Sequence, residues 1–177
     1  MSQPRTTLRE GIRSLPRPVW ILCAGTFVNR FGSFVAVFLV LYLRDRGYSI
    51  PESGLVVSFY GIGNVVAAAV GGWVADRFGR RNALALSMFG SAATLLLLSQ
   101  AASLPLIIVL TTLAGLTGEM YRPAAAALIT DLTPAGERIP AFALNRLAIN
   151  AGFAAGPAVA GLLAEHSFFL LFLGDAL

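Results

Sequence analysis

Four ionisable side chains interrupt long apolar stretches of this chain, where they could bind charged groups or exchange protons. They are Arg30, Glu119, Arg122 and Arg146. A charge that faces lipid is costly, so each should face an aqueous cavity or a partner. Arg30 and Glu119 each lie about 12 residues from the end of an apolar stretch, which at 1.5 Å per residue is about 18 Å and near the middle of a bilayer. They could pair if their two segments are neighbours.

Glu119 is the only acid expected well inside an apolar segment. Arg122 follows it by three residues and can share it on the same helical face. A substrate that disturbs the Arg30–Glu119 pair could change the protonation of Glu119 and so supply proton coupling. The alternative is a purely structural ion pair. One Glu against three Arg leaves two positive charges, which an acid elsewhere or an anionic substrate could balance.

Neutral polar residues in other apolar stretches could complete a substrate or proton cavity around these charges. Asn150 follows Arg146 by four residues and lies on the same side of a helix. Asn29, Tyr60 and Asn64 could line the same cavity from two earlier stretches.

The composition is typical of a membrane protein that crosses the bilayer several times. The chain has 177 residues, of which 56% are hydrophobic and 12% charged, whereas a soluble domain carries about 25% charged residues. One Cys and one His make no metal site, and no cofactor is expected. The basic residues form no soluble basic face, which argues against nucleic-acid binding.

The apolar runs predict a cytoplasmic tail over residues 1–18 and a transmembrane helical unit over 19–177. The uncharged stretch 82–118 is too long for one span, because as a helix it would measure about 55 Å against a core of about 30 Å. It should therefore fold back near residues 99–105. The expected spans are 19–43, 53–75, 82–99, 104–130 and 139–164, with 167–177 beginning a sixth that is too short to cross.

Arginines predict the orientation, because cytoplasmic loops carry an excess of basic residues. Eight fall on the side of the N-terminus and two on the opposite side. The eight are Arg5, Arg9, Arg13, Arg17, Arg77, Arg80, Arg81 and Arg138, and the two are Arg44 and Arg46. The N-terminus is therefore expected in the cytoplasm.

Two stretches of the chain resemble each other at a spacing of 89 residues. Residues 69–76 read Ala-Val-Gly-Gly-Trp-Val-Ala-Asp, and residues 158–165 read Ala-Val-Ala-Gly-Leu-Leu-Ala-Glu. Gly63 falls on Gly152 at the same spacing. Both stretches end a span, and three spans per unit would make the two units inverted in the membrane, as in many secondary transporters. Chance similarity in a chain rich in Gly and Ala is the alternative.

A charged turn separates the second and third spans. Its pattern consists of Gly72, Ala75, Asp76, Arg77, Gly79, Arg80, Arg81 and Leu84. This turn resembles the signature loop of the major facilitator superfamily, with Val74 in place of the usual Leu.

A second pattern lies in the fifth span. It consists of Gly152, Gly156, Pro157, Ala160 and Gly161. It is similar to the Gly-Pro motif of drug–proton antiporters in that superfamily, with Ala160 in place of a Gly. Small residues every four positions let helices approach closely, and Pro157 can bend the helix. Ordinary helix packing would also explain the pattern.

The resemblance implies that the charged turn is a conformational latch at the cytoplasmic face. Asp76 would meet the N-terminus of a helix in the other half of the transporter, and Arg80 would reach an acid at the end of span four, for which Asp131 is the candidate. Gly79 would allow a tight turn. The alternative is that Arg77, Arg80 and Arg81 set only the topology.

One position departs from the antiporter pattern. Many such antiporters carry an Arg in span four, four residues before a Gly, whereas Thr111 stands four residues before Gly115 in this chain. Proton antiport is therefore less firmly implied than the fold.

These observations predict an all-α polytopic membrane protein, the N-terminal six-helix half of a major-facilitator fold. The expected function is secondary transport of small organic molecules by alternating access, as proton-coupled efflux across a bacterial inner membrane. The alternatives are an organic-anion importer or exchanger and a non-transporting signalling or assembly protein. The expected partners are a small-molecule substrate, protons, the lipid bilayer, and a missing C-terminal half or second chain. No ATP-binding loop and no catalytic constellation is recognisable, so an enzyme is not expected.

Overall fold

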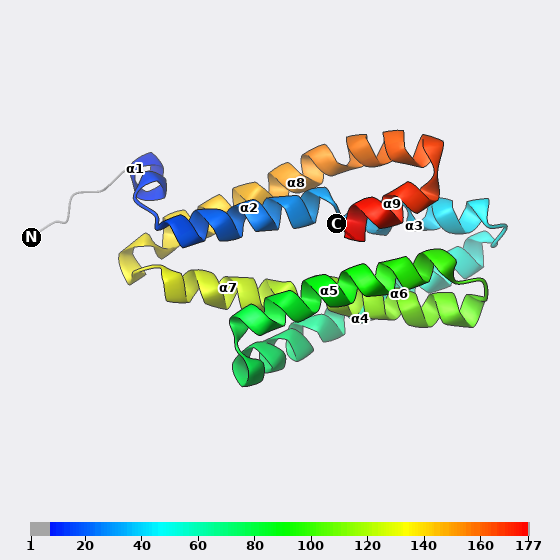
Figure 1. The fold of residues 1–177 in the computed structure, drawn as a ribbon, viewed down its shortest axis with the longest axis horizontal. Helices are drawn as coiled ribbons and strands as arrows, with labels where there is room; N and C mark the ends of the chain where they lie inside the picture. The colour runs from blue at the N-terminus through cyan, green and yellow to red at the C-terminus, as the bar shows by residue number, and fades with distance from the viewer. Residues whose placement is uncertain (1–7, 177) are drawn as a thin grey trace, which may run out of the picture.

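The computed structural model describes residues 8–176, apart from the side chains of residues 164 and 165, and those residues form an all-helical bundle (Figure 1). The helices are α1 (Leu8–Arg13), α2 (Arg17–Phe31), α3 (Phe34–Asp45), α4 (Ile50–Phe78), α5 (Arg80–Gln100), α6 (Leu104–Glu119), α7 (Tyr121–Leu132), α8 (Arg138–His166) and α9 (Phe168–Ala176), with a 3-10 turn η1 (Ala135–Glu137). Arg5 and Leu177, which belong to the expected tail and sixth span, lie outside the described residues.

Five segments of the described residues are long and apolar enough to cross a membrane. Each is 21 to 29 residues long, and 29 helical residues measure about 44 Å, more than the hydrocarbon core of about 30 Å. The segments are Arg17–Asp45, Ile50–Phe78, Arg80–Gln100, Leu104–Leu132 and Ala135–Leu163. These segments are longer than the apolar stretches of the sequence, because the helices also include polar and charged residues at their ends.

The ends of the helices gather at the two ends of the bundle. The helix α1, the α4–α5 turn and the α7–α8 connection lie at one end, which we call the hinge end (Figure 1). The α3–α4, α5–α6 and α8–α9 connections lie at the opposite end. At that opposite end α4 begins with a capping box, in which Ser49 Oγ accepts from the Glu52 amide and Glu52 Oε2 accepts from the Ser49 amide at 2.7 Å.

The first and fourth spans are each broken near the middle. Residues Gly32 and Ser33 separate α2 from α3, and Met120 separates α6 from α7. Pro123 accounts for the second break, since it has no amide hydrogen to donate to the carbonyl of Glu119, four residues earlier. The apolar pattern predicts neither break, because each depends on one or two residues within an otherwise continuous hydrophobic run.

The packing of the spans repeats at the spacing of 89 residues seen in the sequence. A Cβ atom added to Gly63 of α4 would lie 2.9 Å from the Leu116 amide nitrogen of α6. A Cβ atom added to Gly152 of α8 would lie 2.9 Å from the Phe27 carbonyl oxygen of α2. Gly152 follows Gly63 by 89 positions, and Leu116 follows Phe27 by 89 positions. The contact between α8 and α2 is therefore equivalent to the contact between α4 and α6.

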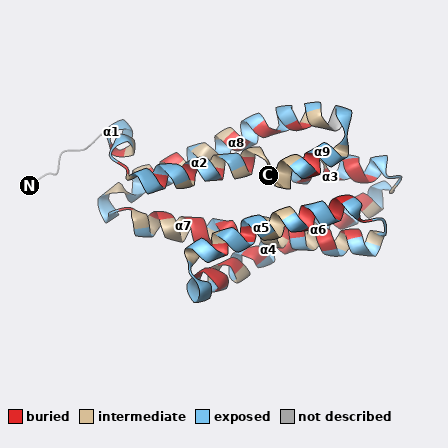
Figure 2. Cartoon of the chain, in the orientation of Figure 1, coloured by how far each residue is buried: buried red, intermediate tan, exposed pale blue. Residues whose placement is uncertain are grey.

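The outer surface of the bundle is strongly apolar. Figure 2 shows exposed positions along the outward faces of every long helix. Val65, Phe89 and Ile139 are 77%, 78% and 78% exposed, and many other large hydrophobic side chains are similarly uncovered. An apolar exterior of this extent is typical of a surface that lipid covers.

Candidate functional site

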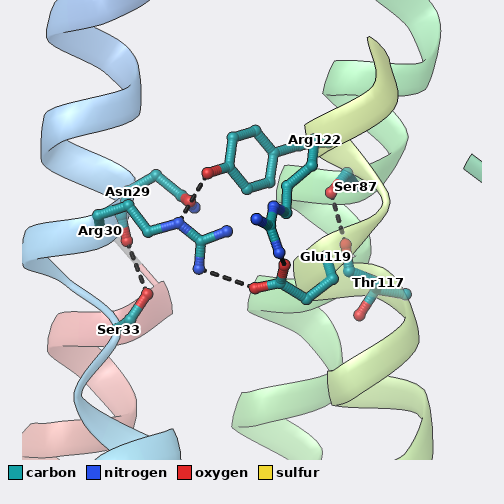
Figure 3. A network of polar contacts seen from close by, with 8 residues as sticks. Asn29, Arg30, Ser33, Ser87, Thr117, Glu119 and Arg122 are labelled. Carbon is teal, nitrogen blue, oxygen red and sulfur yellow. Dashed lines mark hydrogen bonds and ion pairs between the residues drawn. The ribbon is translucent and has the colours of Figure 1, made fainter. Parts of the chain in front are cut away.

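Arg30 lies at the centre of the bundle and bridges the first and fourth spans. Its side chain is 7% exposed, and Nη1 donates to Glu119 Oε1 at 2.8 Å (Figure 3). Its Nε donates to the Tyr121 hydroxyl at 2.7 Å, and its guanidinium lies 5.2 Å from the ring centroid of Phe153. Three neighbours thus stabilise one buried cation, which meets the requirement for a charge inside a membrane.

Glu119 is shared between two arginines. Its second oxygen, Oε2, accepts from Arg122 Nη1 at 3.0 Å (Figure 3). The Glu119 side chain is 14% exposed and that of Arg122 is 61% exposed. The Arg122 contact therefore lies at the edge of the network, and the Arg30 contact lies in its interior.

The ion pair connects equivalent positions of the two similar units. Arg30 and Glu119 are 89 residues apart, and each precedes the break in its span. Arg30 lies in the last turn of α2, where the helix dipole favours a cation. Glu119 is the last residue of α6 and directly precedes the break to α7, so the dipoles of these two helices act on its charge in opposite senses. Its contact with Arg30, rather than a helix dipole, therefore stabilises the Glu119 carboxylate.

A cavity of about 670 Å³ opens beside this pair. This volume lies within the range of about 300–1,000 Å³ typical of small-molecule sites. Most of the wall is apolar, and its residues come mainly from α2, α3, α5 and α6, with the end of α9. The polar lining residues include Asn29, Arg30, Tyr60, Thr111, Glu119 and Asp175. The cavity thus combines apolar walls with a few charged groups, as in sites that bind small organic molecules.

Four residues expected in the cavity lie elsewhere. Arg122 and Arg146 lie outside the lining of this cavity and border a separate hollow of about 650 Å³ with Tyr121. Asn150 is exposed on α8. It lies about 200° around that helix from Gly152, which faces α2, so it cannot face the cavity beside α2. The i,i+4 spacing placed Arg146 and Asn150 on one face but did not say which way that face points.

Asn64 lies at the contact between α4 and α6. A Cβ atom added to Gly115 would be 3.0 Å from Asn64 Oδ1. This oxygen is buried, and no described residue donates a hydrogen bond to it. Asn64 therefore supports close packing of the two helices rather than the cavity wall.

Three lining or pairing residues were not among the expected site residues. Asp175 Oδ2 accepts from the Val35 amide at 3.0 Å and faces the cavity from α9. Its position inside the apolar stretch 167–177 was a usable signal, but that stretch was treated as too short to form a span. The Tyr121 hydroxyl gave no signal, because one tyrosine in an apolar run is common. Thr111 is fully buried and lines the cavity.

The charged turn at the hinge end is tight and polar. Gly79 has a φ of 87°, a conformation that favours glycine, and it separates α4 from α5 directly. Arg80 forms an ion pair with Asp131 at the end of α7. The guanidinium of Arg77 lies 5.7 Å from the ring centroid of Trp73. The ion pair joins the third and fourth spans at this end, whereas the Arg77–Trp73 contact lies within the second span.

The other residues of the turn point outward. Asp76 and Arg81 are exposed and border a hollow of about 600 Å³ that also includes Arg80 and Asp131. Nothing lies within 4 Å of a Cβ atom added to Gly72. These residues are thus not covered by other described parts of the chain.

The small residues of α8 make two different contributions. A Cβ atom added to Gly156 would lie 2.6 Å from the Phe31 carbonyl oxygen, so this glycine allows α8 to approach α2. Ala160 is fully buried against Phe34. Pro157 is exposed, and nothing lies within 4 Å of a Cβ atom added to Gly161. Only the stripe spaced by four residues forms the close contact.

Comparisons with known proteins agree with this architecture. Residues 22–177 match the model of the Major Facilitator Superfamily. The chain is similar to two Bacillus subtilis proteins described as uncharacterized MFS-type transporters. It is 32% identical to YqjV over 78% of this chain and 34% of YqjV, and 32% identical to YttB over 92% of this chain and 41% of YttB. It is also 24% identical to the Staphylococcus aureus quinolone resistance protein NorA, over 80% of this chain and 38% of NorA.

The chain thus spans about two fifths or less of the length of these relatives. The family match covers all five candidate spans except the first residues of the first one. Its members are transporters rather than enzymes. The chain is therefore an integral membrane protein that belongs to the Major Facilitator Superfamily.

Proposed function

We propose that this chain forms the N-terminal half of a proton-coupled exporter of small organic molecules. The observation that carries the proposal is the Arg30–Glu119 ion pair, which lines the cavity and joins the breaks of two spans. The similarity to a quinolone resistance protein supports export of organic molecules. The complete protein would supply the second half, and the bacterial relatives support an inner-membrane location with a cytoplasmic N-terminus.

Protonation of Glu119 is the proposed coupling event. A proton on Glu119 would remove the negative charge that stabilises Arg30 and leave a buried cation without its acidic partner. Breaking a buried ion pair in this way is strongly unfavourable, so the two broken spans would rearrange to give Arg30 a new environment. Alternating access would follow as the two halves rock about the cavity.

The hinge end would act as the latch of this cycle. The Arg80–Asp131 ion pair holds spans three and four together, and the exposed Asp76 could approach a helix N-terminus of the second half. These contacts would hold the outward-open state and break during inward opening.

The charges of the cavity favour neutral or cationic organic substrates. Among the described residues, its lining carries one arginine, Arg30, and two acids, Glu119 and Asp175. Arg122 and Arg146, which would have made an anion site, lie outside the lining. The alternative of an organic-anion importer or exchanger therefore loses the excess buried positive charge on which it rested.

Proton-driven flux tests the proposal directly. The complete protein is reconstituted in liposomes, a pH gradient is imposed, and movement of a fluorescent quinolone is recorded. We expect flux that depends on the gradient in the parent protein, no driven flux in Glu119→Gln, and parental flux in Glu137→Gln, a control outside the cavity. Equal driven flux in the parent and in Glu119→Gln would remove Glu119 from the mechanism.

A further inference from the structure

The N-terminus of α3 is capped by a residue from another span. Ser33 occupies the N-cap position, but its hydroxyl donates back to the Asn29 carbonyl oxygen at 3.0 Å and gives no side-chain cap. Asp175 of α9 takes its place, since Oδ2 accepts from the Val35 amide at 3.0 Å. A carboxylate at a helix N-terminus satisfies an amide that has no partner within the helix.

This cap lies where water cannot easily replace it. Val35 and Phe34 are 6% and 4% exposed. A Cβ atom added to Gly174 would lie 3.0 Å from the Phe34 ring, so α9 approaches the break without an intervening layer. The end of α9 lies about midway along the bundle (Figure 1). If Asp175 stopped accepting, a buried amide would lose its hydrogen bond.

The surroundings of Asp175 contain few other charges. Arg30 comes from α2, Tyr60 from α4 and Glu119 from α6, and all three line the same cavity. The lining residues of α3, α5 and α8 carry no titratable group. Asp175 thus shares the cavity with one ion pair and has no basic side chain hydrogen-bonded to it in the described part of the chain.

We propose that Asp175 is a second proton-binding group of the cavity and that its protonation releases the cap on α3. The proton comes from cavity water and binds a carboxylate oxygen of Asp175. The neutral carboxyl is a weaker acceptor than the carboxylate, so the hydrogen bond from the Val35 amide weakens. The half of span one beyond the break can then move relative to α2, which stays attached to α8 through Gly152 and Gly156.

Protonation of Asp175 thereby connects the cavity to a moving part of span one. The link to export rests on the proposed function, whereas proton binding and cap release do not. The two can be tested apart.

Hydrogen exchange of residues 34–37 measures the cap. The complete protein in lipid nanodiscs, without substrate, is compared at high and low pH, and the rates are corrected for the intrinsic pH dependence of exchange. We expect slow exchange at high pH and an increase of about five- to thirtyfold at low pH, the factor that corresponds to losing an N-cap hydrogen bond.

Two substitutions at Asp175 separate capping from protonation. Asp175→Asn keeps an acceptor that does not titrate, so exchange should be equally slow at both pH values. Asp175→Ala removes the acceptor, so exchange should be equally fast at both. Asp45→Asn, an exposed acid at the other end of α3, should keep the parental pH step.

The proposal is overturned if the pH step persists in Asp175→Asn, or if the parent protein shows no step. Glu119→Gln should retain the step. A step that is present in a protein without proton-driven flux would refute the proposed export while leaving the role of Asp175 intact. Proton-driven flux in the parent protein, together with an unchanged pH step of hydrogen exchange in Asp175→Asn, would support the proposed export and refute the role of Asp175.

Discussion

The planar guanidinium of Arg30 donates hydrogen bonds to groups from two other helices, α6 and α7. One nitrogen meets Glu119 and another meets Tyr121, both within 2.8 Å, while the ring of Phe153 covers its face. A lysine could not reproduce this arrangement, because its ammonium has no fork of donors. Removing one partner of the Arg30–Glu119 pair therefore leaves an unpaired buried charge and lowers the stability of the protein. Removing both partners leaves no unpaired charge and can be tolerated.

A double-mutant cycle tests this coupling. Arg30→Gln and Glu119→Gln should each lower the free energy of unfolding by about 3–5 kcal/mol, because each leaves a buried charge unpaired. The double variant should be less destabilised than the sum of the two. Thermal unfolding of the purified complete protein in detergent gives the comparison. Arg122→Gln, whose side chain is 61% exposed, should cost about 1 kcal/mol or less. Additive losses in the double variant would exclude the coupling.

Helix length and contact were partly readable from the sequence, but helix breaks were not. The apolar runs predicted five spans, and five described segments are long and apolar enough to cross a membrane, because the thickness of the bilayer sets the length of a hydrophobic span. The small residues of the fifth span indicated a close contact, which α8 makes with α2. The break at Met120 depends on the missing amide of Pro123, a single residue that hydrophobic periodicity does not register. The direction of Asn150 depends on which face of α8 meets α2, and tertiary packing decides that.

The glycine stripe of α8 allows a test with a control on the same helix. Gly156→Val should lower the free energy of unfolding by about 1–3 kcal/mol, because even its Cβ would lie 2.6 Å from the Phe31 carbonyl oxygen. Gly161→Val should cost clearly less, since nothing lies within 4 Å of its added Cβ. Thermal unfolding of the two variants side by side provides the measurement. Equal losses would show that α8 does not approach α2 through this stripe.

Across the whole molecule, the two similar units meet at the centre and are tied at the hinge end. The Arg30–Glu119 pair joins positions 89 residues apart, and the Arg80–Asp131 pair ties span three to span four. One contact lies beside the cavity and the other far from it. In a transporter that works by alternating access, one group binds the coupling proton, and a distant contact sets which side of the membrane the cavity opens to. The sequence indicated both pairs, but not that Asp175 would join the first.

The hinge ion pair should set the balance between the two access states. Arg80 and Asp131 are 35% and 45% exposed, so their pair is worth about 0.2–1 kcal/mol, and its loss should shift the ratio of the two states by about 1.4- to fivefold. Arg80→Gln and Asp131→Asn should each speed labelling of a cysteine at Ser91, in the cavity, by a reagent added on the hinge side, in a Cys23→Ala background. The charge exchange Arg80→Asp with Asp131→Arg should restore the parental rate, and Arg81→Gln should leave it unchanged. If the exchanged pair labels as fast as either single variant, the contact does not act as a latch, and positive charge at this end serves only to orient the chain.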